Sequence, residues 1–332
     1  MEKHEIESAI KDFKVFLKIT WEHLRLPSPT RMQYYIADYL QEGHKRSQLE
    51  ALRGIGKTWI TGAYVAWRLL RDPNEKILIV SQSGNHSDNI SIFIRKLIDT
   101  MPILEHLQPR SDQRSSVVSF DVNGCNVSVQ PSVKALGITS QLQGNRASLL
   151  ISDDVEGQQN SATERRRQDL LNQVAEYEAI LQTTTNAQIL VLGTPQTSES
   201  IYARLRDKGY VTRIYPARYP ENTDSYQGCL ADYIVEDMAK NPMLINTPID
   251  SRFNEEDLYQ RELSYGRSGF KLQFMIDTTL SDSEKYPLKT KDLIITDMGA
   301  MEAPTKLLWS SQSHDSVTDI PNLGFSGDTF QR

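Results

Sequence analysis

The chain has 332 residues, of which 39% are hydrophobic and 24% charged, a composition typical of a globular protein. Its formal net charge of −6 excludes a uniformly basic nucleic-acid coat, although a few Lys and Arg side chains would still suffice for a local phosphate-binding groove. Two cysteines are too few for a disulfide scaffold, and no stretch approaches the ~20 apolar residues of a membrane span, so we expect an intracellular protein without a membrane anchor.

The first 45 residues are predicted to form a helical segment. Residues 5–24 repeat apolar side chains at helical spacing, which predicts one amphipathic helix. Two prolines between Leu26 and Thr30 stop it, and Thr30 is a candidate N-cap for a second helix over 31–42. We expect this segment, residues 1–45, to pack on the domain that follows.

Residues 46–221 alternate apolar runs of strand length with helical patterns, and a hairpin is predicted around Asn123-Gly124, with strands at 117–120 and 126–130. Alternation of this kind predicts an α/β fold with a mainly parallel sheet and helices on both faces. The other expected strands are 48–52, 76–81, 148–152 and 188–192, and the expected helices are 57–70, 86–100, 161–181 and 198–207.

The pattern loosens after residue 221. Residues 222–300 carry two short helical patterns, 228–240 and 254–265, separated by proline-containing turns, and we interpret them as a small accessory (lid) subdomain. Residues 301–332 are mostly polar, which is typical of a linker-like tail.

A glycine-containing loop between a strand and a helix matches the pattern G-x-x-x-x-G-K-[ST], except that alanine replaces the first glycine. Backbone N–H groups of such a loop surround a phosphate, a lysine contacts the β- and γ-phosphates, and a hydroxyl binds Mg²⁺. The helix that follows favours anions at its N-terminus. We therefore predict ATP and Mg²⁺ as ligands of a loop made of Ala51, Leu52, Arg53, Gly54, Ile55, Gly56, Lys57 and Thr58.

Arg53 is a bulky cation inside this loop. One interpretation makes it a second positive group on the γ-phosphate, beside Lys57. The alternative is a surface arginine at a variable loop position.

A hydrophobic strand ends in a cluster of carboxylates, since residues 148–152 lead directly into Asp153, Asp154 and Glu156. Carboxylates at such a strand end, beside a phosphate loop, hold magnesium and the attacking water. We assign Asp153, with Thr58, to Mg²⁺. Asp154 is a candidate catalytic base, and Glu156 is its rival because aspartate is one methylene shorter than the glutamate of many such enzymes. A solvated acidic turn is the alternative for the whole cluster.

Three further residues are candidates for the site, each with a plain structural alternative. Thr194 follows a predicted strand and could sense the γ-phosphate, or it could belong to an ordinary turn before Pro195. Gln33 could read the adenine edge with its amide, or lie on a helix surface. Arg146 could reach a phosphate in its own site or in a neighbouring subunit, or be a surface arginine.

These residues together resemble a known family. The loop with its internal Arg53, the Pro29/Gln33 element, the run Asp153–Glu156 and Gly193-Thr194-Pro195-Gln196 look like the ATPase half of the large terminase subunit of short-tailed double-stranded DNA phages. The resemblance runs through about residues 10–330, and its more family-specific segments are Ser268–Met275 and Leu280–Leu288. It implies a RecA/ASCE-like P-loop NTPase fold.

The resemblance also implies a function. Members pump double-stranded DNA into a procapsid, with the portal protein and the small terminase subunit as partners, as a homo-oligomeric ring that is usually a pentamer. They act in the cytoplasm of the infected host cell, at the portal vertex. Their nuclease domain follows the ATPase, and since no strand-borne acidic triad is found after residue 222, we expect no nuclease activity from this chain.

Two other functions remain open on the sequence. A helicase-type ATPase would need a second RecA-like half, for which 222–332 is short and irregular. A protein that binds ATP as an assembly switch and hydrolyses it slowly would carry the same loop.

Overall fold

The computed structural model describes residues 3–184, 186–279, 325–326 and 329–330. It divides into one unit of Met1–Thr279 and a second of Leu280–Arg332. In the second unit the described strands β8 (Phe325–Ser326) and β9 (Thr329–Phe330) pair antiparallel. The end of the expected accessory segment, most of the expected tail and the family-like run Leu280–Leu288 lie outside the described residues.

The first unit is built on a seven-stranded sheet with the strand order β3-β4-β2-β5-β6-β1-β7. All neighbouring strands are parallel except β3 and β4. The predicted α/β fold with a mainly parallel sheet is confirmed. The strands are β1 (Arg46–Ala51), β2 (Ile77–Ser81), β3 (Ser119–Phe120), β4 (Val133–Gly137), β5 (Leu149–Asp153), β6 (Gln188–Gly193) and β7 (Val211–Tyr215).

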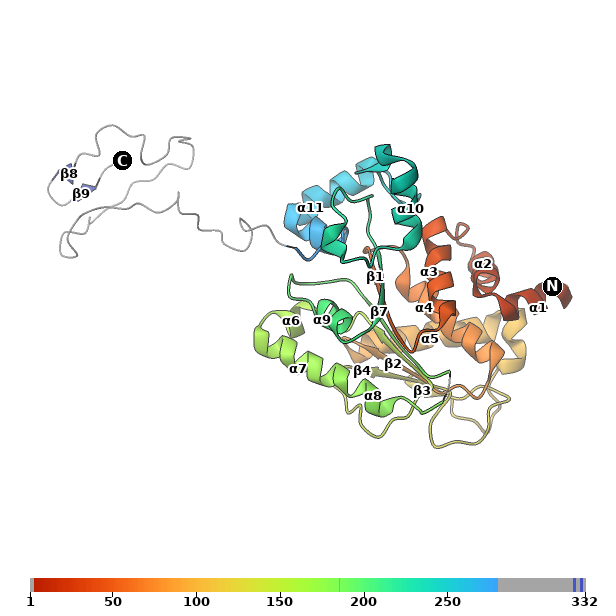
Figure 1. The fold of residues 1–332 in the computed structure, drawn as a ribbon. Helices are drawn as coiled ribbons and strands as arrows, with labels where there is room; N and C mark the ends of the chain where they lie inside the picture. The colour runs from red at the N-terminus through yellow and green to blue at the C-terminus, as the bar shows by residue number, and fades with distance from the viewer. Residues whose placement is uncertain (1–2, 185, 280–324, 327–328, 331–332) are drawn as a thin grey trace. The chain divides into compact units, whose positions relative to one another are not determined.

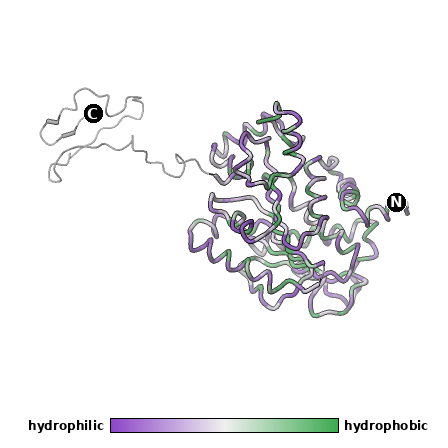
Figure 2. The backbone as a smooth tube through the Cα atoms, in the orientation of Figure 1, coloured by the Kyte–Doolittle hydropathy of each residue, from purple (hydrophilic) through white to green (hydrophobic). Residues whose placement is uncertain are grey.

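Alternate residues of the central strands enter two separate hydrophobic cores. Ile77 and Ile79 of β2 join the core formed with the helices between residues 3 and 100, whereas Leu78 and Val80 join the core formed with the helices between residues 164 and 207. Leu149, Leu150 and Ile151 of β5 alternate in the same way. Helices therefore cover both faces of the sheet (Figure 1), and apolar residues run along its buried strands (Figure 2).

The N-terminal segment packs on the sheet's first core, but the single helix expected over 5–24 is two helices. Asp12 interrupts it in an extended conformation and accepts a hydrogen bond from the Lys14 amide, so it caps the second helix. The Thr30 N-cap is confirmed, because Thr30 and Gln33 form a reciprocal capping box. The helices are α1 (Lys3–Lys11), α2 (Phe13–His23) and α3 (Arg31–Glu42).

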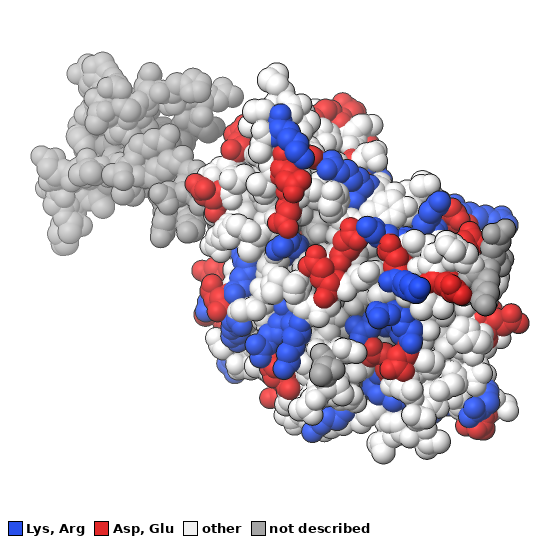
Figure 3. Space-filling model, turned by 45° about the vertical axis from the view of Figure 1, so that its right-hand side comes forward, with Lys and Arg blue, Asp and Glu red and all other residues white. Residues whose placement is uncertain are grey.

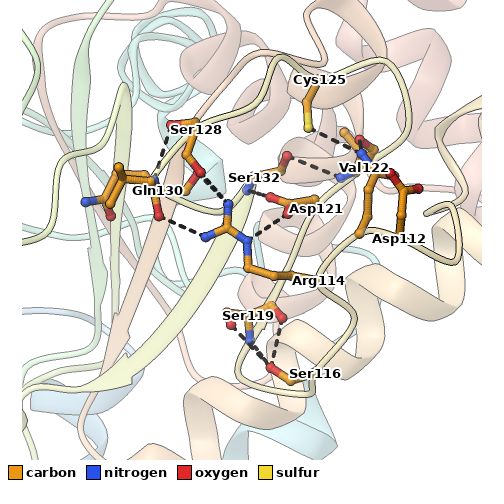
Figure 4. A network of polar contacts seen from close by, with 12 residues as sticks. Asp112, Arg114, Ser116, Ser119, Asp121, Val122, Cys125, Ser128, Gln130 and Ser132 are labelled. Carbon is orange, nitrogen blue, oxygen red and sulfur yellow. Dashed lines mark hydrogen bonds and ion pairs between the residues drawn. The ribbon is translucent and has the colours of Figure 1, made fainter.

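The hairpin expected around Asn123-Gly124 is wrong. Residues 126–130 form no strand, and β3 pairs instead with β4, which the sequence pattern did not reveal. The Arg114 guanidinium donates to the backbone carbonyl groups of Ser128, Val129 and Gln130 and pairs with Asp121 (Figure 4). Those carbonyls thus bond to a side chain rather than to a neighbouring strand.

The helices after β1 follow the expected order, with two differences. The helix expected over 254–265 continues to Gln273. The helix expected over 161–181 is three short helices, because Thr163 caps a new helix and the chain turns again at Glu176. The helices are α4 (Lys57–Arg71), α5 (Gly84–Thr100), α6 (Gln158–Ser161), α7 (Glu164–Ala175), α8 (Tyr177–Ile180), α9 (Ile201–Asp207), α10 (Asp232–Lys240) and α11 (Glu255–Gln273, kinked at Gly266), with 3-10 turns η1 (Pro102–Leu107), η2 (Asp224–Tyr226) and η3 (Pro242–Leu244).

The surface carries charges of both signs. On the face drawn in Figure 3, Lys and Arg side chains are interspersed with Asp and Glu, so this face bears no continuous basic groove. Among the described residues no helix is both long and apolar enough to cross a bilayer.

Candidate nucleotide-binding site

The sheet topology brings the predicted site residues to one edge. The loop at 51–58 leaves the carboxyl end of β1 and opens α4. β6 lies between β1 and β5 and pairs with both, so Thr194, which follows β6, stands between the loop and the acidic end of β5. Residues from all three of these places line a cleft of about 1600 Å³. A parallel sheet binds ligands at this edge, outside the carboxyl ends of its strands.

The loop has the conformation that its glycines allow. Gly54 and Gly56 both have a φ of 92°, in a region that residues with a Cβ rarely adopt. The Gln33 amide and the Arg252 guanidinium both donate to the Ile55 carbonyl, at 2.8 and 2.9 Å. The loop is therefore held from both the N-terminal segment and the segment before α11.

Lys57 lies at the centre of the site. Its buried ammonium donates to the Ala51 carbonyl at 3.1 Å and to the Thr194 hydroxyl at 2.7 Å, and Thr194 in turn donates to the same carbonyl at 3.1 Å. The Lys57 side chain thus points back to its own loop, and Thr194 contacts the Lys57 ammonium directly. A phosphate in the loop would compete with Thr194 for this cation.

Asp153 and Thr58 form a pair that fits a magnesium ion. The Thr58 hydroxyl lies 3.4 Å from Asp153 Oδ2, and Oδ1 of the fully buried Asp153 has no hydrogen-bond partner. A buried carboxylate oxygen without a partner is costly unless a cation binds it. Groups of three or more His, Cys, Asp or Glu that could hold a metal are absent from the described part of the chain. Substrate phosphates are therefore expected to complete the coordination, as is usual for magnesium.

Asp154 lines the cleft beside Asp153. Its backbone has a φ of 46°, which aspartate tolerates better than most residues, and its amide donates to the Leu192 carbonyl at 3.0 Å. Burial raises the pKa of its carboxyl group, the nearby Lys57 cation lowers it, and the negative charge of Asp153 raises it. Among the described residues no protein donor bonds to its carboxylate, which is therefore placed to accept a hydrogen bond from water.

Glu156 has a different environment. One oxygen accepts from the Gln196 amide at 2.8 Å, and the other accepts from the Ser200 hydroxyl and the Ile201 amide, both at 2.8 Å. Burial raises the pKa of its carboxyl group, and these donors oppose that effect. Glu156 thus ties the acidic strand end to the start of α9, and both of its oxygens are already engaged.

Arg53 and Gln33 are both at the cleft. Arg53 is exposed, its guanidinium lies 3.4 Å from the Tyr265 hydroxyl, and its amide donates to the Gln273 carbonyl. Gln33 is buried rather than exposed on the helix surface, and its amide oxygen also accepts from Thr30. Each end of the Gln33 amide therefore already makes one hydrogen bond within the chain.

Arg146 is exposed and lies just before β5, at the end of the strand opposite to Asp153. A five-residue strand is about 16 Å long, which exceeds the reach of an arginine side chain. The structure therefore does not bring Arg146 to the cleft of its own chain, and the interpretation of Arg146 as a finger in its own site is corrected.

The sequence analysis missed His86 and Arg252, two cleft residues that contact the predicted site. His86 lies on α5, with its Nε2 atom 3.6 Å from Asp153 Oδ2, and that carboxylate raises the pKa of the imidazole. Arg252 reaches the loop from a segment about two hundred residues away in the chain. No local pattern marks either residue, because tertiary packing alone brings them to the site.

Comparison with known proteins gives a clear relative. The chain is 45% identical over 324 residues to the terminase large subunit of Enterobacteria phage T3, which covers 96% of this chain and 55% of that protein. The chain thus spans about half the length of the curated relative that it matches. No protein-family model matches it.

Solved structures are similar in part. The large terminase ATPase domain of Thermus phage P74-26 is 10% identical, with a TM-score of 0.44 and coverage of 78% of this chain and 97% of that one. The large terminase of another thermophilic bacteriophage, solved in complex with ADP, is 9% identical, with a TM-score of 0.42 and coverage of 74% and 52%.

Proposed function

This chain belongs to the family of terminase large subunits, and we propose that it hydrolyses ATP to drive double-stranded DNA into a procapsid. The observation that carries the proposal is the contact between Lys57 and Thr194. Asp153, whose Oδ1 atom has no hydrogen-bond partner, and the cleft-lining Asp154 stand at the end of β5, two strands away from β1 in the sheet. A cation for the phosphates, a carboxylate for the metal and a candidate catalytic base thus lie at one cleft.

The proposed reaction uses these residues in distinct roles. The loop amides and Lys57 bind the β- and γ-phosphates, and Thr58 and Asp153 would hold Mg²⁺, which would offset phosphate charge. Asp154 orients water for in-line attack on the γ-phosphorus. We favour Asp154 over Glu156 as the base because both oxygens of Glu156 already accept hydrogen bonds from the chain.

Thr194 is proposed to report the state of the nucleotide. Its hydroxyl accepts a hydrogen bond from Lys57, and a γ-phosphate would take that donor. Arg53 and Arg252 connect the same loop to α11 and to the segment before it. A change at the phosphate would therefore be transmitted to the accessory segment, which we propose moves the bound DNA.

Arg146 is exposed and far from the cleft of its own chain. We therefore propose only that it contacts the phosphates bound by the next subunit of a ring. If it acts between subunits, Arg146→Ala protein mixed into wild type should reduce ATP turnover by more than its own fraction. Phosphate release is measured across mixing ratios. A loss merely proportional to the fraction added, or normal turnover of the pure variant, would remove Arg146 from the mechanism.

The proposed partners are double-stranded DNA, the portal protein, the small terminase subunit and further copies of this chain in a ring, at the portal vertex in the host cytoplasm. We propose no nuclease activity for this chain.

The proposed function predicts ATP turnover that rises when double-stranded DNA and the portal are added. Phosphate release is measured with each component alone and with both together. Slow turnover that neither component changes would favour a nucleotide switch, and ATP-dependent strand separation would favour a helicase. Either result would contradict the motor.

A further inference from the structure

A large aromatic side chain stands in the cleft without a role in phosphate chemistry. Trp59 directly follows Thr58 in the first turn of α4, and it lines the same cleft as Lys57 and Asp154. Its side chain is 43% exposed, whereas most apolar residues of α4 are buried. An exposed indole on the wall of a ligand cleft offers a stacking surface, and nucleobases stack on such surfaces.

The Trp59 ring is held in position from behind. Phe93 of α5 contacts it in a T-shaped arrangement, with ring centroids 5.0 Å apart. Phe93 fits there because Gly62, one turn further along α4, has no side chain; a Cβ at Gly62 would lie 2.5 Å from the Phe93 ring. Gly62 thus leaves room for Phe93, and Phe93 supports the indole. A side chain that is already held in position loses less conformational entropy when a ligand binds.

Apolar side chains also line the cleft near the first helices, beside the polar Ser28, Thr30 and Gln33. Trp21, Leu26 and Pro27, from the end of α2 and the turn after it, line the same cleft as Trp59. A triphosphate chain and its metal need N–H groups, cations and carboxylates, which the loop and the end of β5 supply. The apolar wall suits a flat, weakly polar group attached to that triphosphate.

We propose that Trp59 stacks on the nucleobase of the bound nucleoside triphosphate and so forms the base subsite of the cleft. This inference rests on the proposed function, since it takes the loop as the triphosphate site. The strength of stacking depends on the area of the base and not on its hydrogen-bonding groups. Purines should therefore bind more tightly than pyrimidines, and Trp59 should carry that preference.

Calorimetric titration tests this with three ligands: the β,γ-imido analogues of ATP and CTP, and inorganic tripolyphosphate, all with Mg²⁺. Loss of a stacked base weakens binding roughly ten- to a hundredfold. Trp59→Ala should weaken binding of the ATP analogue by about that factor and leave tripolyphosphate binding unchanged. It should also reduce the preference for the ATP analogue over the CTP analogue. Trp59→Phe should retain most of the affinity.

Tyr259→Ala is the matched control, because Tyr259 is an exposed aromatic residue of α11 that does not line the cleft. It should leave all three affinities unchanged. Equal losses for tripolyphosphate and the ATP analogue in Trp59→Ala would mean that the indole only supports the loop, and no loss would place the base elsewhere; both overturn the proposal. Wild-type protein that binds none of the three ligands would instead refute the nucleotide site itself.

Discussion

Replacing Lys57 with alanine should reduce ATP hydrolysis by at least ~100-fold, the usual cost of removing one charged donor from a phosphoryl-transfer site. The buried ammonium is directed at the loop by the Ala51 carbonyl and Thr194. An alanine leaves the γ-phosphate without this cation, which is needed most when negative charge shifts during transfer. Phosphate release at saturating ATP measures the effect.

Lys96→Ala is the matched control, since Lys96 is an exposed lysine of α5. It should hydrolyse ATP at the wild-type rate. Far-ultraviolet circular dichroism should show that both variants are folded. Wild-type turnover by a folded Lys57→Ala protein would refute the assignment of the loop.

The second large effect separates the two candidate bases. Asp154→Asn should reduce turnover by roughly 100- to 10,000-fold, because general base catalysis contributes about that much. Its stability should not fall, since burial already disfavours the charged carboxyl group and asparagine tolerates the positive φ. Turnover and the free energy of unfolding are measured on the same preparations.

Glu156→Gln should lower the free energy of unfolding and leave turnover largely intact. An amide cannot accept hydrogen bonds at both ends, so at least one of the donors from Gln196, Ser200 and Ile201 loses its partner, at a cost of about 1–3 kcal/mol. Asp169→Asn, on the exposed face of α7, should change neither quantity. A stable Glu156→Gln protein with no turnover, beside an active Asp154→Asn protein, would exchange the two roles.

The sequence predicted the parts of the fold that follow from strong local patterns. The buried runs of β2, β5 and β6 and the helix after the loop appear as expected, since long apolar runs and clear periodicity leave few alternatives. Two strands of the same five-residue length as β2 and β5 were not found, because their burial is less continuous: β4 alternates buried and half-buried residues, and β7 begins with an exposed Val211. The turn signal at Asn123-Gly124 was misleading because Arg114 satisfies the carbonyls that a hairpin strand would have paired.

The site could be predicted as far as its residues lie on strand ends. Lys57 contacts Thr194, and Thr58 contacts Asp153, because parallel strands end at one edge of a sheet. The contacts of Arg252 and His86 depend on how distant segments pack, and no spacing in the sequence encodes them. The hydrogen bonds of Glu156 could not be predicted either, because they depend on where the start of α9 packs.

A crystal structure of this chain with Mg²⁺ and a non-hydrolysable ATP analogue tests the central claim most directly. It should show the β- and γ-phosphates in the loop at 51–58, the Lys57 ammonium moved from Thr194 to phosphate oxygens, a metal on Thr58 and Asp153, and a water on Asp154. A nucleotide bound away from the loop, or one that leaves Lys57 bonded to Thr194 and Ala51, would contradict the account.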